Sequence, residues 1–252
     1  ESVGDTNDQL LAVRNKALLA GIYHIQYKCA EAEALYLDAL SGFEDLLPKD
    51  DPETLRLVAK LAALYRSQNL DYKAMLLYAR ILMKFQMTLG YDHLDTLRIH
   101  SMIAGMHRRK KEYLEAEDIY MSILEKFRKT LKPDHPDTLQ IMHNLGAIYS
   151  DQGKYEDASI MFKAALEGYE REFGYDHPDT LRTVHCVGIV LQNQKHFEEA
   201  DECYTRALLG LERVLGSKHP DVMKVASHSA ALRSYFFKNP FSNFSQASNE
   251  NA

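Results

Sequence analysis

The amino-acid sequence predicts an all-α fold in which five pairs of antiparallel helices follow one another and one further helix caps the last pair. Two observations lead to this prediction. The motif His-Pro-Asp-Thr-Leu occurs at residues 135–139 and returns 42 residues later at 177–181. At the same interval, apolar residues recur with spacings of three and four, which places them on one face of a helix. A fixed period of this length indicates a repeat architecture.

The repeat boundaries follow from this register. Related motifs begin at Asp51, His93 and His219, all in phase with the two full copies. The predicted repeats are 9–47, 51–89, 93–131, 135–173 and 177–215, with a capping helix at 220–237. Together, residues 1–238 form a single repeat domain. Residues 239–252 are polar and almost free of aliphatic side chains, so we predict a disordered tail.

Columns of equivalent residues predict which helix faces are buried. The second helix of each repeat carries an alanine column, then an aromatic column four residues on: Ala32, Ala74, Ala116, Ala158, Ala200 and Tyr36, Tyr78, Tyr120, Phe162, Tyr204. The first helix carries an apolar column and then a small one: Leu19, Leu61, Ile103, Leu145, Val187 and Ala20, Ala62, Ala104, Gly146, Gly188. Small residues let the two helices of a repeat approach closely, and a polar turn such as 151–154 joins them as an antiparallel pair.

Composition excludes several classes of protein. The chain has 252 residues, 46% of them hydrophobic and 26% charged, as in folded water-soluble domains. A net charge of −6 gives no general affinity for nucleic acid. No apolar run is long enough to span a membrane. Three cysteines suit a reducing compartment, so we expect a cytoplasmic protein. The chain begins at Glu1, which suggests a piece of a longer protein.

The HPDTL motif is interpreted as a helix start. Proline is favoured at the first helical position, which makes His135, and Asp51 in the second repeat, the expected N-caps. The acid after the proline then lies in the first turn, where it complements the helix dipole. A catalytic His–Asp pair or a metal site is disfavoured, because successive copies start separate helices and share no third group.

These columns carry a resemblance to a known family. A small residue three before tyrosine in the first helix, then Ala-x-x-x-Tyr-x-x-Ala in the second, resembles the tetratricopeptide repeat, and residues 144–158 match it best. The 42-residue form resembles kinesin light chains and the repeat tails of NACHT- and NB-ARC-type signalling ATPases. The resemblance implies a right-handed α-solenoid with a peptide-binding groove. Kinesin light chains of this type bind acidic peptides with an aromatic anchor, and Asn144 matches the family asparagine that holds the ligand backbone.

One face of each first helix is not used for the core, and the resemblance implies that it lines the groove. Across the repeats this face holds nine Lys or Arg and one acid, Asp151, although the whole chain has 30 Lys or Arg and 36 Asp or Glu. Such a surface attracts an acidic partner. The predicted peptide-binding residues are Arg56, Lys60, Arg66, Arg98, Arg108, Arg109, His143, Asn144, Arg182 and His185. The alternative is a solvated face, in which Arg56, Arg98 and Arg182 pair with acids three residues earlier in their own helices.

We therefore expect a protein-interaction module that is not an enzyme, needs no cofactor and binds an acidic peptide. The alternative is a repeat array that packs on its own parent ATPase as a sensor or autoinhibitory domain. Nucleic-acid binding through the basic face is less favoured, because the rest of the chain is acidic. A metal site at His143, His185, Cys186 and His228 lacks close ligand spacing. Residues 239–241, Asn-Pro-Phe, match the tripeptide that EH domains bind.

Overall fold

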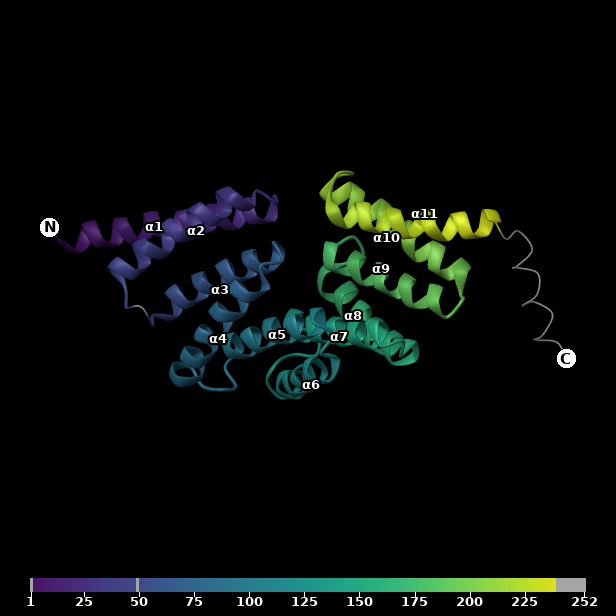
Figure 1. Ribbon diagram of the computed structural model, residues 1–252, viewed down its shortest axis with the longest axis horizontal. Helices are drawn as coiled ribbons and strands as arrows, with labels where there is room; N and C mark the ends of the chain where they lie inside the picture. Colours follow the sequence, from purple (N-terminus) through teal and green to yellow (C-terminus); the bar gives the residue numbers. More distant parts are fainter. Residues whose placement is uncertain (1, 49, 239–252) are drawn as a thin grey trace. The chain divides into compact units, whose positions relative to one another are not determined.

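The computed structural model describes residues 2–48 and 50–238, and the regular structure in these ranges is α-helical (Figure 1). The chain forms two compact units that divide between Ile119 and Tyr120, inside helix α6 (Tyr113–Thr130). The predicted disordered tail, with its Asn-Pro-Phe sequence, lies outside the described residues. Each unit is described by itself.

Unit 1 holds two complete antiparallel helix pairs and the helix that follows them. Helix α1 packs against α2, α3 packs against α4, and each pair contacts the next helix along the chain. The bounds are α1 Ser2–Ile25, α2 Cys29–Leu46, α3 Pro52–Ser67, α4 Asp71–Thr88 and α5 Leu94–Arg109. Helices α5 and α6 follow as the third pair, so the predicted fold class of five successive pairs is confirmed, with α1 beginning earlier than expected.

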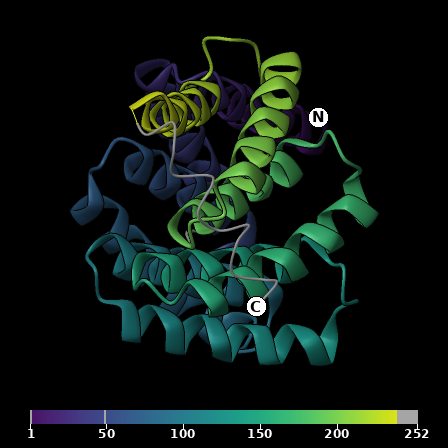
Figure 2. The same cartoon turned by 90° about the vertical axis from the view of Figure 1, so that its right-hand side faces the viewer.

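Unit 2 contains two more pairs and a last single helix. Helix α7 packs against α8, α9 packs against α10, and α11 packs against both α10 and α9. The bounds are α7 Pro136–Asp151, α8 Tyr155–Phe173, α9 Pro178–Asn193, α10 Phe197–Leu215 and α11 Pro220–Lys238. Figure 2 shows α11, in yellow, following α10 after a short loop. Near its end the ring of Tyr235 contacts that of Phe197 on α10, so α11 caps the fifth repeat.

The structure confirms that the HPDTL motif starts a helix. The Nδ1 atoms of His93, His135, His177 and His219 each accept a hydrogen bond, 3.2 Å long, from the backbone N–H two residues on. Asp51 does the same with its carboxylate at 2.8 Å. The threonine of the motif is buried, and in two copies its hydroxyl donates to the carbonyl of a preceding glycine, Thr96 to Gly90 and Thr180 to Gly174. The first residue of the motif therefore caps the helix, and its threonine contributes to the buried interior.

The predicted core columns are buried. The alanine and aromatic columns of the second helices are all nearly inaccessible to solvent. In the first helices, Leu61, Leu145 and Val187 are buried as expected, whereas Ile103 is only partly buried and Leu19 is 40% exposed. The prediction was wrong at Leu19 because no helix pair precedes α1 in the structure to cover that side.

A left-handed residue closes the turn between the two helices of every repeat. The residues with positive φ at these turns are Tyr27, Asn69, Lys111, Gly153 and Lys195, which are equivalent in the repeat. Only Gly153 is a glycine, the residue that adopts this conformation at no steric cost. Asn69 also adopts this conformation readily, whereas Tyr27, Lys111 and Lys195 hold a side chain in a disfavoured region.

Among the helices that the structure describes, none is both long and apolar enough to cross a membrane.

Candidate functional site

The basic face of the first helices is organised by ion pairs between successive repeats. Arg14 on α1 donates to both carboxylate oxygens of Glu53 on α3, at 2.7 and 2.8 Å. Arg56 on α3 donates to Asp95 on α5, and Arg182 on α9 donates to Asp221 on α11 at 2.7 Å. In each pair the acid lies 39 residues after the arginine, in the first turn of the next first helix. These three pairs are called the arginine ladder.

The arginine ladder changes the alternative interpretation, in which each arginine pairs with an acid three residues earlier in its own helix. Arg182 does contact Asp179 three residues earlier at 2.7 Å, and Arg98 lies 3.4 Å from Asp95. Glu53, however, bonds to Arg14 of the preceding repeat instead of Arg56. The hydrogen bonds from Arg14 lower the pKa of Glu53, so this carboxylate is held in its charged form. Arginines of the predicted basic face are therefore largely used to connect repeats.

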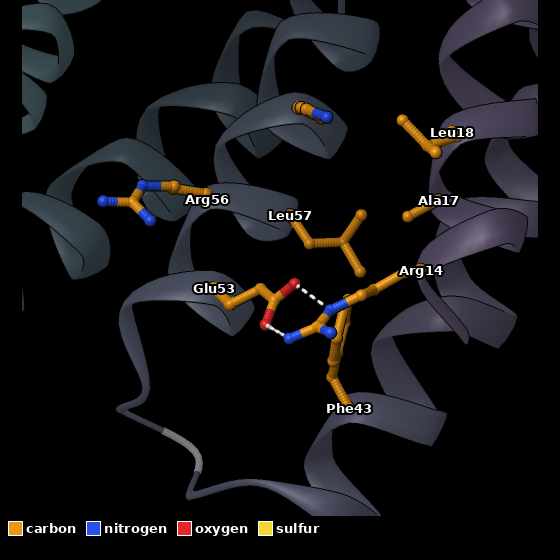
Figure 3. Close-up of a pocket in the computed structure, with 8 residues that line it drawn as sticks. Arg14, Ala17, Leu18, Phe43, Glu53, Arg56 and Leu57 are labelled. Atoms are coloured by element: carbon orange, nitrogen blue, oxygen red, sulfur yellow. Dashed lines mark hydrogen bonds and ion pairs between the residues drawn. The ribbon is translucent and has the colours of Figure 1, made fainter. Parts of the chain in front are cut away.

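A pocket of about 400 Å³ lies between α1, α2 and α3 on this face (Figure 3). Ala17 and Leu18 of α1, Phe43 of α2 and Leu57 of α3 form its apolar lining, and the Arg14–Glu53 pair lies at its edge. Leu57 and Phe43 belong to the buried core, whereas Leu18 is exposed. The pocket is large enough for one or two side chains of a ligand.

The charges around the pocket are mainly positive. Its rim contains Arg14, Arg56 and Lys60 but only one carboxylate, that of Glu53. Arg14 and Arg56 are engaged by the ladder, and Figure 3 shows the Arg56 side chain extending away from the Arg14–Glu53 pair. Lys60 is exposed and makes no ion pair with any described residue. Its ammonium group is therefore available to a negatively charged ligand.

The other predicted site residues of unit 1 serve mixed purposes. Arg109 donates to the backbone carbonyl of Arg66 at 2.8 Å and to the side chain of Asn69, which ties α5 to the turn between α3 and α4. Its guanidinium also lies 3.4 Å from Asp71. Arg98 is exposed, and Arg66 and Arg108 are half-buried. Arg109 thus has a structural role in addition to any contact with a ligand.

In unit 2 the predicted residues form a mostly neutral polar row. His143 Nδ1 lies 3.1 Å from the Thr183 hydroxyl, which itself donates to a backbone carbonyl, so the histidine is the donor. Asn144 accepts a hydrogen bond from Gln140 at 3.3 Å. His185 is only 5% exposed and is enclosed by Tyr204 and His228, in contrast to the open pocket of unit 1.

Sequence reasoning placed the cations of the pocket correctly on one face but missed two of its features. Phe43 was not among the residues predicted for the basic face, because it lies on the second helix of its repeat. Glu53 was assigned only to a helix start. In the described part of the chain, no three His, Cys, Asp or Glu side chains lie close enough to hold a metal ion.

The fourth repeat lacks the ladder arginine, and this leads to a first prediction. Gln140 occupies the position of Arg14, Arg56 and Arg182, and Asp179 lies 39 residues after it. We expect Gln140→Arg to raise the free energy of unfolding by about 0.2–1 kcal/mol at low salt, a small gain because the pair is solvent-exposed. Urea unfolding at two ionic strengths measures it. Gln140→Met is the uncharged control, and an equal gain in that variant would contradict an ionic origin.

The fold defines the class: a helical-repeat protein built from successive antiparallel helix pairs. Family models described as tetratricopeptide repeat match residues 16–53, 95–171 and 180–221, which is more than half of the chain. The chain belongs to the tetratricopeptide repeat family. A search of curated proteins finds no significant match.

Solved structures share this fold at low sequence identity. The kinesin light chain-like repeat protein of Podosopora anserina is 20% identical, with a TM-score of 0.59 over 81% of this chain and 97% of its own. BtubC of P. vanneervenii is 21% identical, with a TM-score of 0.63 over 86% and 92%. The Rap regulator of plasmid pLS20, solved with the Phr* peptide, is 14% identical, with a TM-score of 0.75 over 95% and 66%.

Proposed function

We propose that the protein is an interaction module that binds an extended acidic peptide of a partner protein. The observation that carries the proposal is the pocket between α1 and α3. It combines an apolar lining with a basic rim, and its Lys60 has no partner among the described residues. An apolar side chain of the peptide would occupy the pocket, and acidic residues beside it would contact Lys60.

Each part of the pocket favours such a ligand for a physical reason. Leu18 and Leu57 exclude water from a bound apolar group, which gives affinity without chemical specificity. The positive rim adds charge-assisted hydrogen bonds to carboxylates and disfavours basic peptides. The pLS20 regulator, which has the same fold, was solved with a peptide, so the architecture is compatible with peptide ligands.

The experiment uses three fluorescently labelled probes: an Asp/Glu-rich peptide with one central tryptophan, the same peptide with alanine at that position, and a lysine-rich analogue. We expect the acidic tryptophan peptide to bind best, and its binding to weaken as salt screens the charges. Lys60→Glu should weaken binding at least tenfold in an anisotropy titration. Leu18→Glu, which changes an exposed wall of the pocket, should also weaken it.

Lys163→Glu is the matched control. Lys163 is exposed on α8, and its replacement changes the net charge as much as Lys60→Glu does. Arg56 is unsuitable for this test, because reversing its charge also breaks its ion pair with Asp95. Equal loss of binding in the two lysine variants would show only a general charge effect. Unchanged binding in both Lys60→Glu and Leu18→Glu would exclude the pocket as the peptide site.

A further inference from the structure

The outward face of α4 carries an uninterrupted row of exposed apolar side chains. Tyr72, Leu76, Met83 and Met87 are 78%, 54%, 54% and 77% exposed, and Ala79 lies between them on the same face. This row is called the α4 stripe. The opposite face of the helix holds the core residues, so packing within the repeat does not require the stripe. Folded monomers rarely expose a continuous apolar surface of this kind without a function.

Helices α8 and α10 show what this face carries in two other repeats, and in α6 the row holds two apolar residues, Leu114 and Met121, among charged ones. In α8 the equivalent positions are Glu156, Ile160, Lys163, Glu167 and Arg171. In α10 they are Glu198, Glu202, Thr205, Leu209 and Arg213. Both helices pair with a first helix in the same way as α4 does, yet each has one large apolar residue in this row. The repeat architecture therefore does not explain the α4 stripe.

The charges beside the stripe are basic. Arg80 and Lys73 are exposed next to it, and after Asp71 the sequence of α4 contains no acid. Lys84, on the same side, is paired with Asp50 at 2.7 Å. A partner with acidic residues flanking its own apolar row would complement both the stripe and this rim.

A second copy of the chain is a poorer match than such a partner. The stripe would align with itself in an antiparallel arrangement, with Tyr72 facing Met87 and Leu76 facing Met83. Its centre then falls between Ala79 and Arg80, so the Arg80 side chains of the two copies would meet. Like charges at the centre of an interface oppose association.

We propose that the α4 stripe is a docking surface for an amphipathic helix of a partner protein, with an apolar row flanked by Asp or Glu. Apolar residues spaced by three and four on one helix are what such a partner would bury. The two methionines can adjust to side chains of different shape, because the Met side chain is unbranched and flexible. The surface is separate from the proposed peptide pocket, which lies on α1, α2 and α3.

The test uses a designed helical peptide, matched to α4 in length, with a leucine row flanked by glutamates. A second peptide has lysines in place of the glutamates. We expect the glutamate peptide to bind the wild-type chain at least tenfold more tightly than the lysine peptide. Leu76→Glu combined with Met83→Glu should abolish binding, and Arg80→Glu should reduce the preference for the glutamate peptide. All three replaced side chains are exposed, and unchanged circular dichroism would show that the fold persists.

Two control variants and two assays for other occupants complete the test. Ile160→Glu changes the equivalent exposed residue of α8 and should leave binding unchanged. Lys60→Glu should also leave it unchanged, so this proposal can fail or hold independently of the peptide pocket. Persistence of binding in Leu76→Glu/Met83→Glu would overturn the proposal. So would a concentration-dependent dimer, or binding to phosphatidylserine vesicles, that the same double variant abolishes, since the occupant would then be a second copy or a lipid surface.

Discussion

Gly188→Ala is expected to lower the free energy of unfolding by about 1–3 kcal/mol, the usual result of adding a methyl group to a filled core. A Cβ at residue 188 would lie 2.8 Å from the ring of Tyr204 and 3.1 Å from Cys203 Cβ. The Tyr204 ring is 1% exposed, and its hydroxyl donates to Gln192 at 2.7 Å, so the ring has little room to move. Urea unfolding measures the loss.

Gly21→Ala is the matched control, because Gly21 also lies inside a first helix. The nearest atom to its added Cβ would be the Tyr36 hydroxyl at 3.6 Å, an ordinary contact. Alanine has a higher helix propensity than glycine, so this variant should gain up to about 1 kcal/mol. If both variants changed stability in the same direction, the close approach of α9 and α10 at Gly188 would not be the cause.

The second large effect is a loss of stability in mild acid that arises from His185. Burial of the ring lowers the pKa of His185 to about 3, and the nearby His228 and Lys224 act in the same direction. The unfolded chain takes up a proton near the ordinary pKa of about 6.5, but the folded chain does not. The contribution of neutral, buried His185 to stability is therefore present above pH 6.5. As the pH falls below this value, the free energy of unfolding declines. Between pH 7 and pH 5 this one group should lower the free energy of unfolding by about 2 kcal/mol.

The measurement is urea unfolding at pH 7, 6 and 5 for the wild type and for His185→Gln. Glutamine keeps a polar side chain that can bond to His228 but does not titrate. We expect the variant to be less stable at pH 7 and to lose less stability on acidification. The quantity to compare between the two proteins is the change in the free energy of unfolding with pH, and not its value at any single pH. An identical decline in the two proteins would assign the effect to other groups, of which the half-buried His228 also has a lowered pKa.

The sequence predicted the fold because the 42-residue period repeats both the helix starts and the buried columns. Asp51 and His135 were correctly predicted as N-caps, since a cap depends on a few neighbouring residues. Leu19 was wrongly placed in the core, because a column says which side is buried only where another helix covers it.

The candidate site was less predictable because it depends on contacts between repeats. The basic face was recognised from Arg14, Arg56 and Lys60, but the sequence did not show that Glu53 belongs beside Arg14, 39 residues away. The enclosure of His185 by His228 likewise depends on how α9 and α11 pack. The α4 stripe is visible in the sequence, since its residues differ from the equivalent positions of α8 and α10.

The arginine ladder also has a consequence for how cooperatively the chain unfolds. A repeat protein is stable through its individual repeats and through the interfaces between neighbours. Each ladder pair joins a repeat to the next one, so salt should weaken the interfaces while the apolar packing inside each repeat persists. Between α7 and α9, where Gln140 interrupts the ladder, the uncharged bond from His143 to Thr183 connects the helices. Ionic strength should therefore loosen the three ladder junctions more than the junction between α7 and α9.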